Sequence, residues 1–148
     1  MRNRLEDLRD EKNLYKKNVA QNIGVVESVY SEWENGRVSI PTKRLYQLAE
    51  FFEVNIDYLI GITDKRVKIR KNKEIDIDVV SLRLKEIRKS LKMTMRDLAE
   101  KFNTSSSTIS NYENGKFLIL GSFLVELCMF SNYSIDWVLG RSDKKYHD

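Results

Sequence analysis

Cysteine and histidine are almost absent from this sequence. The single cysteine, Cys128, excludes an internal disulfide and cannot form a cysteine-rich zinc cluster. The single histidine, His147, falls within the last two residues, where we expect a disordered tail rather than a catalytic or metal-binding group. We therefore expect this protein to use no metal and no cofactor.

The sequence also lacks the features of membrane proteins, exported proteins and enzymes. No apolar run approaches the length of a membrane span, and the first residues form no apolar signal core, so we expect a cytoplasmic protein without a membrane partner. No glycine-rich phosphate loop, histidine pair or organised carboxylate pair is present, so we expect no enzymatic activity. The 41% hydrophobic and 32% charged residues are typical of a soluble globular chain.

A tandem duplication organises the chain. Adding 79 to a residue number in the first half gives the equivalent residue in the second half without a gap. Arg9 becomes Arg88, and the Glu-Asn-Gly sequence at 34–36 recurs at 113–115. Chance does not produce such a register across a whole domain, so each copy should be a small domain with its own core. The expected organisation is a first domain over 1–66, a linker over 67–80, and a second domain with a short tail over 81–148.

The stretch 104–115 of the second copy predicts a short helix with two different faces. Thr104 and Ser105 are candidate N-caps, and Gly115 tolerates the left-handed conformation that ends a helix. Ile109 and Tyr112 lie three residues apart on a packing face. The opposite face carries short polar side chains, as a helix lying in a DNA major groove requires. These side chains are those of Ser106, Ser107, Thr108 and Asn111.

Helical spacing of apolar residues predicts four further helices in each copy, so the expected fold class is all-α. Thr94 and Asp97 have the spacing of a capping box. Thr42 is the expected N-cap of the fourth helix of the first copy, and Asn55 and Ser134 are expected to cap the last helix of each copy. The core stripe of the fourth helix is predicted at Leu45, Leu48, Ala49 and Phe52.

Two interpretations of the linker at 67–80 stay open. Val67, Ile69, Ile75 and Ile77 alternate with charged residues, which is a faint signal for a β-hairpin. A plain charged linker explains the same residues, with Asp78 as a candidate cap of the helix that follows. Fully extended, these residues reach about 45 Å. Adjacent half-sites on one DNA face lie about 34 Å apart, so the linker permits both copies to bind one duplex.

Charge is distributed unevenly between the copies. Residues 4–66 contain 10 lysines and arginines and 11 aspartates and glutamates, a net charge of −1. Residues 83–145 contain 11 and 7, a net charge of +4. The basic excess of the second copy suits a polyanionic partner, although a solvated surface of mixed charge is the ordinary alternative.

Several motifs carry a family resemblance. The second copy contains R-L-x-x-I-R at 83–88, D-L-A-E-K-F at 97–102, S-S-T-I-S-N-Y-E-N-G at 106–115 and S-I-D-W-V-L-G at 134–140. The first copy contains R-L-x-x-L-R at 4–9, Y-S-E-W-E-N-G at 30–36 and N-I-D-Y-L-I-G at 55–61. With these motifs, each copy resembles the phage-repressor (Cro-like, Xre-type) helix-turn-helix domain, a five-helix, lambda-repressor-like fold. The resemblance covers nearly everything except the linker and the tail.

The resemblance implies that the third helix of such a domain reads base edges while the start of the second helix contacts phosphate. It also implies a structural pair between Arg9 and Glu34, and another between Arg88 and Glu113. In the second copy, Ser106, Ser107 and Asn111 would contact bases. Thr108, Arg96, Asn114 and Lys116 would face the sugar-phosphate backbone. Ser105, at the start of the third helix, is also expected at the DNA interface.

The first copy departs from this pattern because its third helix carries outward glutamates. One interpretation is that Glu27 or Glu32 accepts hydrogen bonds from cytosine amino groups. The other is that these charges weaken DNA contact and that the copy serves dimerisation or a protein partner. The residues of the first copy that we expect at a DNA interface are Lys16, Lys17, Glu27, Ser28, Glu32 and Arg37.

Two functions are consistent with these observations. The first is a sequence-specific, DNA-binding transcriptional regulator, in particular a repressor of phage or mobile-element type, with double-stranded DNA as its partner. The second is a protein-interaction module, antitoxin-like or inhibitor-like, that retains the helix-turn-helix fold. A homodimer or a protein partner held through the first domain is compatible with either function.

Overall fold

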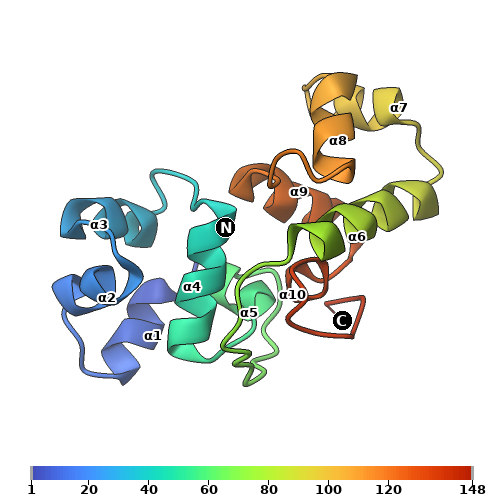
Figure 1. The fold of residues 1–148 in the computed structure, drawn as a ribbon. Coiled ribbons are helices and arrows are strands. Elements are labelled where there is room, and N and C mark those ends of the chain that lie inside the picture. Colours follow the sequence, from blue (N-terminus) through green and yellow to red (C-terminus); the bar gives the residue numbers. More distant parts are fainter. Residues whose placement is uncertain (1, 148) are drawn as a thin grey trace. The chain divides into compact units, whose positions relative to one another are not determined.

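The computed structural model describes residues 2–147, and within that range the chain forms ten helices and one isolated β-bridge (Figure 1). This confirms the all-α class. The chain divides into two compact units, Met1–Lys73 and Glu74–Asp148. The first unit contains α1 (Leu5–Glu11), α2 (Lys16–Ile23), α3 (Glu27–Asn35), α4 (Thr42–Phe52) and α5 (Ile56–Ile60). The second contains α6 (Ile77–Ser90), α7 (Met95–Lys101), α8 (Ser106–Glu113), α9 (Gly121–Ser131) and α10 (Ile135–Val138).

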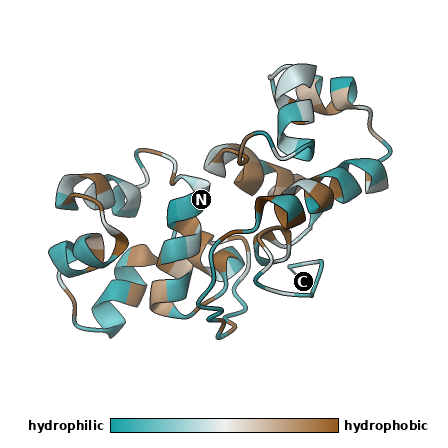
Figure 2. Cartoon of the chain, viewed as in Figure 1, coloured by the Kyte–Doolittle hydropathy of each residue, from teal (hydrophilic) through white to brown (hydrophobic). Residues whose placement is uncertain are grey.

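Each unit has its own hydrophobic core, built around its fourth helix. The predicted stripe on α4 is confirmed, because none of its four residues is more than 3% exposed, and α4 packs against α2 and α5. Leu124, Leu127 and Cys128 of α9 occupy the equivalent buried positions. Hydrophobic residues recur at intervals along α4 and α6 and alternate with hydrophilic ones (Figure 2). No helix in the described range is both long and apolar enough to cross a bilayer.

The second and third helices of each unit contact one another and are joined by a tight turn. The turn passes through Gly24 at φ 85° in the first unit and through Asn103 at φ 56° in the second. Both values lie in the left-handed region, which glycine and asparagine tolerate better than other residues. The duplication therefore preserves a backbone conformation as well as a sequence.

Three of the predicted helix caps are confirmed. Thr94 and Asp97 exchange the two hydrogen bonds of a capping box at the start of α7, each with an N···O distance of 3.0 Å. The hydroxyl of Ser105 accepts from the backbone N–H of Thr108, and that of Ser134 accepts from the N–H of Trp137. These hydrogen bonds satisfy amide groups that have no partner inside their helices.

Other cap assignments were wrong. Pro41 occupies the N-cap position of α4, and Thr42 is the first helical residue, 3% exposed. Asn55 lies at the N-cap of α5, but its side chain binds the segment that follows α5 instead of the helix. At α6 the cap is Asp76, whose carboxylate accepts from the N–H of Asp78, so Asp78 lies inside the helix.

The linker and the C-terminal tail also differ from expectation. Residues 67–76 contain no strand, so the hairpin interpretation is wrong. Helix α6 begins at Ile77 and includes the last four residues of the expected linker. The tail is ordered rather than disordered. Tyr146 forms the β-bridge with Tyr133, with ring centroids 4.9 Å apart, and the N–H of His147 donates to the carbonyl of Asn132 at 3.2 Å.

Candidate nucleic-acid interface

An arginine–glutamate pair fixes the position of α8 in the second unit. Nε of Arg88, on α6, lies 2.6 Å from one carboxylate oxygen of Glu113, and its Nη2 lies 3.0 Å from the other. Its remaining Nη1 donates to the carbonyl of Met93, immediately before α7, at 2.9 Å. One guanidinium group thus connects the first helix, the approach to the second and the end of the third. Such a two-pronged arrangement is specific to arginine.

The first unit contains the same pair, as the family resemblance implied. Nε of Arg9 lies 2.7 Å from the carboxylate of Glu34, and Nη1 donates to the carbonyl of Leu14 at 2.9 Å. In both units the hydrogen bond to the glutamate raises the pKa of the arginine, while partial burial opposes that rise. Both glutamate side chains are no more than 5% exposed, so these hydrogen bonds are shielded from water.

The predicted base-reading residues lie together on the outward face of α8. Ile109 and Tyr112 are buried, at 2% and 7% exposure, while Ser106 and Ser107 are exposed and Asn111 is half-buried. The structure gives the Asn111 side chain no hydrogen-bond partner among the described residues. Its amide is therefore available to an external partner with one donor group and one acceptor atom.

The two hydroxyl groups at the start of α8 are engaged with each other. The hydroxyl oxygens of Ser105 and Thr108 lie 2.9 Å apart, in addition to the cap bond that Ser105 accepts. Ser105 is exposed and Thr108 is half-buried. Their orientation is therefore set before any partner binds, which reduces the entropy lost on contact.

Basic and polar groups flank α8 on both sides. Arg96, on the first turn of α7, is 83% exposed in its side chain and lies 3.3 Å from Glu100, an exposed pair of little energetic weight. Beyond α8, Gly115 turns the chain at φ 76°. The side-chain oxygen of Asn114 accepts from the N–H of Lys116 at 3.0 Å, and both residues are exposed. Along the chain, exposed Arg96 thus precedes the predicted base-reading residues, and exposed Asn114 and Lys116 follow them.

The equivalent face of the first unit has a different chemistry. Glu27 and Ser28 are exposed, but Glu32 lies 3.6 Å from Arg37, so this arginine is paired with the acid beside it. Lys16 donates to the hydroxyl of Ser31 at 3.1 Å. Lys17 is exposed, with its Nζ 5.7 Å from the centre of the Tyr15 ring. Two of the three predicted cations of this face therefore already have internal partners.

Comparison with known proteins matches each of the two units separately. A family model described as a helix-turn-helix domain matches residues 3–64 and, separately, residues 82–143. The chain belongs to the helix-turn-helix domain family. It is also 34% identical over 61 residues to YobD of Bacillus subtilis (strain 168), whose name describes it as an uncharacterized HTH-type transcriptional regulator. That match covers 41% of this chain and 54% of YobD, so it spans about half of the relative's length. No solved structure matches the chain significantly.

Exposed apolar side chains lie near both third helices, and the sequence did not lead us to expect those of Phe117, Leu120 and Val38. In the second helix-turn-helix domain, Phe117 and Leu120 are 54% and 63% exposed and border a groove of about 730 Å³ that Thr108 and Asn111 also line. In the first domain, Val26, Val29 and Val38 are 65%, 39% and 49% exposed. A signal was present in the sequence, because large apolar residues in irregular segments or on an outward helix face have no predicted partner.

Replacing the arginine of the second pair tests its structural role. Arg88→Lys removes the two-pronged contact and the bond to Met93, so we expect the second helix-turn-helix domain to lose about 2–3 kcal/mol of unfolding free energy. Urea unfolding followed by the fluorescence of Trp137, in a Trp33→Phe background, reports this domain selectively.

The matched control is Arg96→Lys, which changes an exposed pair on the same domain. We expect it to change the unfolding free energy by less than about 0.5 kcal/mol. Equal effects of the two substitutions would contradict the structural role of Arg88.

Proposed function

We propose that this chain is a sequence-specific DNA-binding transcriptional regulator and that it represses by occupying an operator and excluding polymerase. The observation that carries the proposal is the surface of the second domain. There, a helix face of short polar side chains with an unpaired Asn111 amide lies between Arg96 and Lys116. The assignment to the phage or mobile-element type of repressor rests on the sequence resemblance alone.

The chemistry of this face fits the major groove. An asparagine amide offers the donor and acceptor that pair with the N6 and N7 edge of adenine, and the hydroxyls of Ser106 and Ser107 serve either kind of base edge. The absence of long side chains on this face allows α8 to approach the bases closely. Arg96 and Lys116 would contact phosphates, which orient the helix without specifying sequence.

For the first domain, we propose phosphate contact to the same duplex without strong base readout. Lys17 is exposed at the start of α2, and Arg37 follows the turn after α3, at positions equivalent to Arg96 and Lys116. The pairing of Arg37 with Glu32 partly neutralises the acid that would otherwise face the groove. The net charge of −1 in this copy makes its contribution the weaker of the two.

A second candidate function for the first domain is protein binding. Val26, Val29 and Val38 expose apolar surface around α3, and the first turn of α3 carries the exposed acidic Glu27. Such a surface is better suited to a protein than to DNA. Salt separates the candidates, because DNA binding through several cations weakens steeply as the salt concentration rises.

Two substitutions in the second domain test the division between base readout and phosphate contact. Asn111→Ala should relax preference at one or two base pairs and cost about 1–3 kcal/mol on the preferred site. Lys116→Ala should weaken binding to all sequences alike. It should also reduce the slope of the logarithm of the binding constant against the logarithm of the salt concentration by about one. Titration of both variants with selected and scrambled duplexes at several salt concentrations measures each effect. An unchanged sequence preference in Asn111→Ala would exclude α8 as the reading helix.

Neutralising the two glutamates of α3 tests the role of the first domain. The double substitution of Glu27→Gln and Glu32→Gln removes repulsion and frees Arg37, so we expect DNA affinity at low salt to rise about two- to tenfold. Asp7→Asn, an exposed charge on α1, is the control for a general change in net charge. If the double variant gains no more affinity than this control, the first domain does not lie near the phosphates.

A further inference from the structure

The segment after α5 forms a strap, residues 67–73, that is bound to the first domain at three places. Asn55 makes the first anchor. Its N–H donates to the carbonyl of Val67 at 3.0 Å, and its side-chain oxygen accepts from the N–H of Val67 at 2.8 Å. Its amide group also donates to the carbonyl of Lys65 at 3.0 Å. Asn55 is 6% exposed, so these hydrogen bonds are shielded from water.

The second and third anchors are glutamates on α4 and just after it. Glu53 lies 3.3 Å from Arg70. The carboxylate of Glu50 accepts from the N–H groups of two consecutive strap residues, Lys71 at 2.9 Å and Asn72 at 2.7 Å. Asn72 has a φ of 53°, so the strap turns sharply where Glu50 binds it. Hydrogen bonds from amides to a carboxylate are among the stronger ones available to a protein surface.

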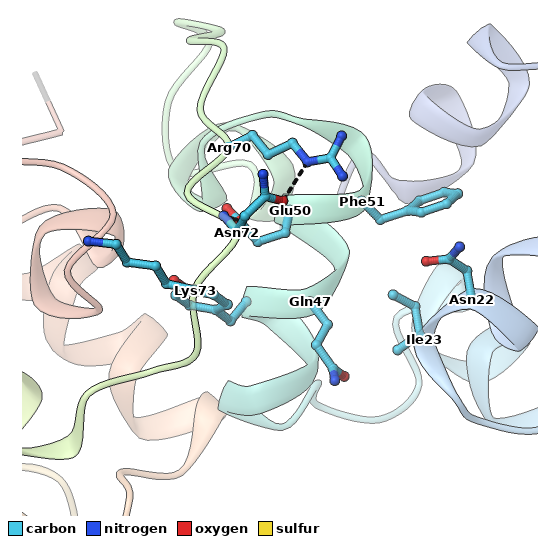
Figure 3. Close-up of a pocket in the computed structure, with 9 residues that line it drawn as sticks. Asn22, Ile23, Gln47, Glu50, Phe51, Arg70, Asn72 and Lys73 are labelled. Carbon is cyan, nitrogen blue, oxygen red and sulfur yellow. Dashed lines mark hydrogen bonds between the residues drawn. The ribbon is translucent and has the colours of Figure 1, made fainter.

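Figure 3 shows this anchor at the edge of a cavity of about 450 Å³. Glu50, Arg70 and Asn72 lie together on one side, while Ile23 lies on α2 across the cavity. Nε of Arg70 donates to the side-chain oxygen of Asn72 at 2.9 Å, which closes the turn of the strap on itself. The strap is therefore part of the first domain as far as Lys73.

The residues from Ile77 onward belong to the second domain, because they form the start of α6. Helix α6 begins at Ile77, whereas α1 begins at Leu5, the equivalent of Leu84, so α6 is longer by two turns at its start. Val80 and Ser81 in this extension are 1% and 6% exposed. A Cβ placed on Gly115 would lie 3.6 Å from the hydroxyl of Ser81, so the extension packs beside the turn that ends α8.

Three residues, 74–76, therefore connect the strap to α6. Fully extended, three residues span about 10 Å, whereas the ten residues 67–76 would span about 34 Å if the strap were released. The anchors of the strap decide which of these lengths applies. An ordinary flexible linker has no such anchors, so the distance that it can span depends on its number of residues and its composition.

We propose that Glu50, by holding the strap, is a positioning residue that limits the separations of half-sites that the two domains can occupy together on one duplex. The proposal rests on the proposed function, in which both domains contact the same DNA. A short connection raises the effective concentration of the second domain at a matching separation and prevents binding at longer ones. Release of the strap would allow longer separations and dilute the effective concentration at the preferred one.

The test compares the full chain with Glu50→Gln, which removes the negative charge and keeps the side-chain shape. The probes are duplexes that carry the half-site protected by each domain in the footprint of the wild-type chain, with the two half-sites separated by spacers of increasing length. Because Asn55 and Glu53 still hold Val67 and Arg70 in this variant, the connection lengthens from three residues to the six residues 71–76. With the −3/2 power dependence on linker length, this should lower affinity at the preferred separation by about threefold and raise affinity at longer ones. Asp7→Asn is the matched control, and it should leave the ranking of spacers unchanged.

Two further measurements test whether Glu50 holds the strap and whether the length of the connection sets the spacer preference. Without any DNA present, the amides of Lys71 and Asn72 should be protected from hydrogen exchange in the wild type. Their exchange rates should rise about tenfold in Glu50→Gln. Insertion of Gly-Ser after Glu74 lengthens the connection directly and should broaden the spacer preference in the same direction as Glu50→Gln.

The possible outcomes distinguish a failure of this proposal from a failure of the proposed function. If the footprint of the wild-type chain covers the half-site of the second domain only, binding of both domains to one duplex is wrong, and this proposal falls with it. If two half-sites are preferred but Glu50→Gln keeps the wild-type ranking of spacers, the positioning role of Glu50 alone is overturned. Random-coil exchange at Lys71 and Asn72 in the wild type would overturn it as well.

Discussion

The two-pronged pair between an arginine of the first helix and a glutamate at the end of the third is the interaction on which each domain depends. In the second domain, Arg88 holds Glu113 and the carbonyl of Met93 simultaneously. Every candidate base contact of this domain lies on α8, so the orientation of its proposed reading surface follows from this group. Removing one member of such a shielded pair leaves a charge without compensation, which costs far more than the loss of an exposed pair.

The same scaffold presents two different surfaces. Around α8 the outward residues are short and polar, and exposed cations flank them. Around α3 the corresponding positions carry valines and glutamates, and Arg37 is paired with Glu32. The arginine–glutamate pairs and the hydrophobic character of the core positions are shared between the copies, whereas the outward residues of the third helix differ except at Ser28 and Ser107. This is what duplication followed by divergence of function produces, because packing constrains the inward face and leaves the outward face free to change.

The helix caps and core positions that depend on the spacing of nearby residues were predicted from the sequence. The core stripe of α4, the capping box of Thr94 with Asp97 and the cap at Ser105 all follow from residue spacing. The behaviour of Asn55 was not predictable in this way, because its side chain binds residues 65 and 67, which the spacing around α5 does not reveal. The alternation of apolar residues after Val67 likewise reflected a strap lying on the first domain rather than a hairpin. At the candidate site, residue spacing predicted the outward positions of Ser106 and Ser107, whereas the exposure of Phe117 was not predicted because it lies in the irregular segment after α8.

The most direct test of the account is selection of binding sites from random duplex DNA by the full chain, followed by footprinting of the selected sequence. The account predicts an enriched motif that is protected over the major groove and whose recovery decreases steeply as the salt concentration rises. It also predicts that this motif is no longer enriched when Ser106, Ser107 and Asn111 are all replaced by alanine. No enriched sequence, even at low salt, would contradict the account and would favour a protein partner for this surface.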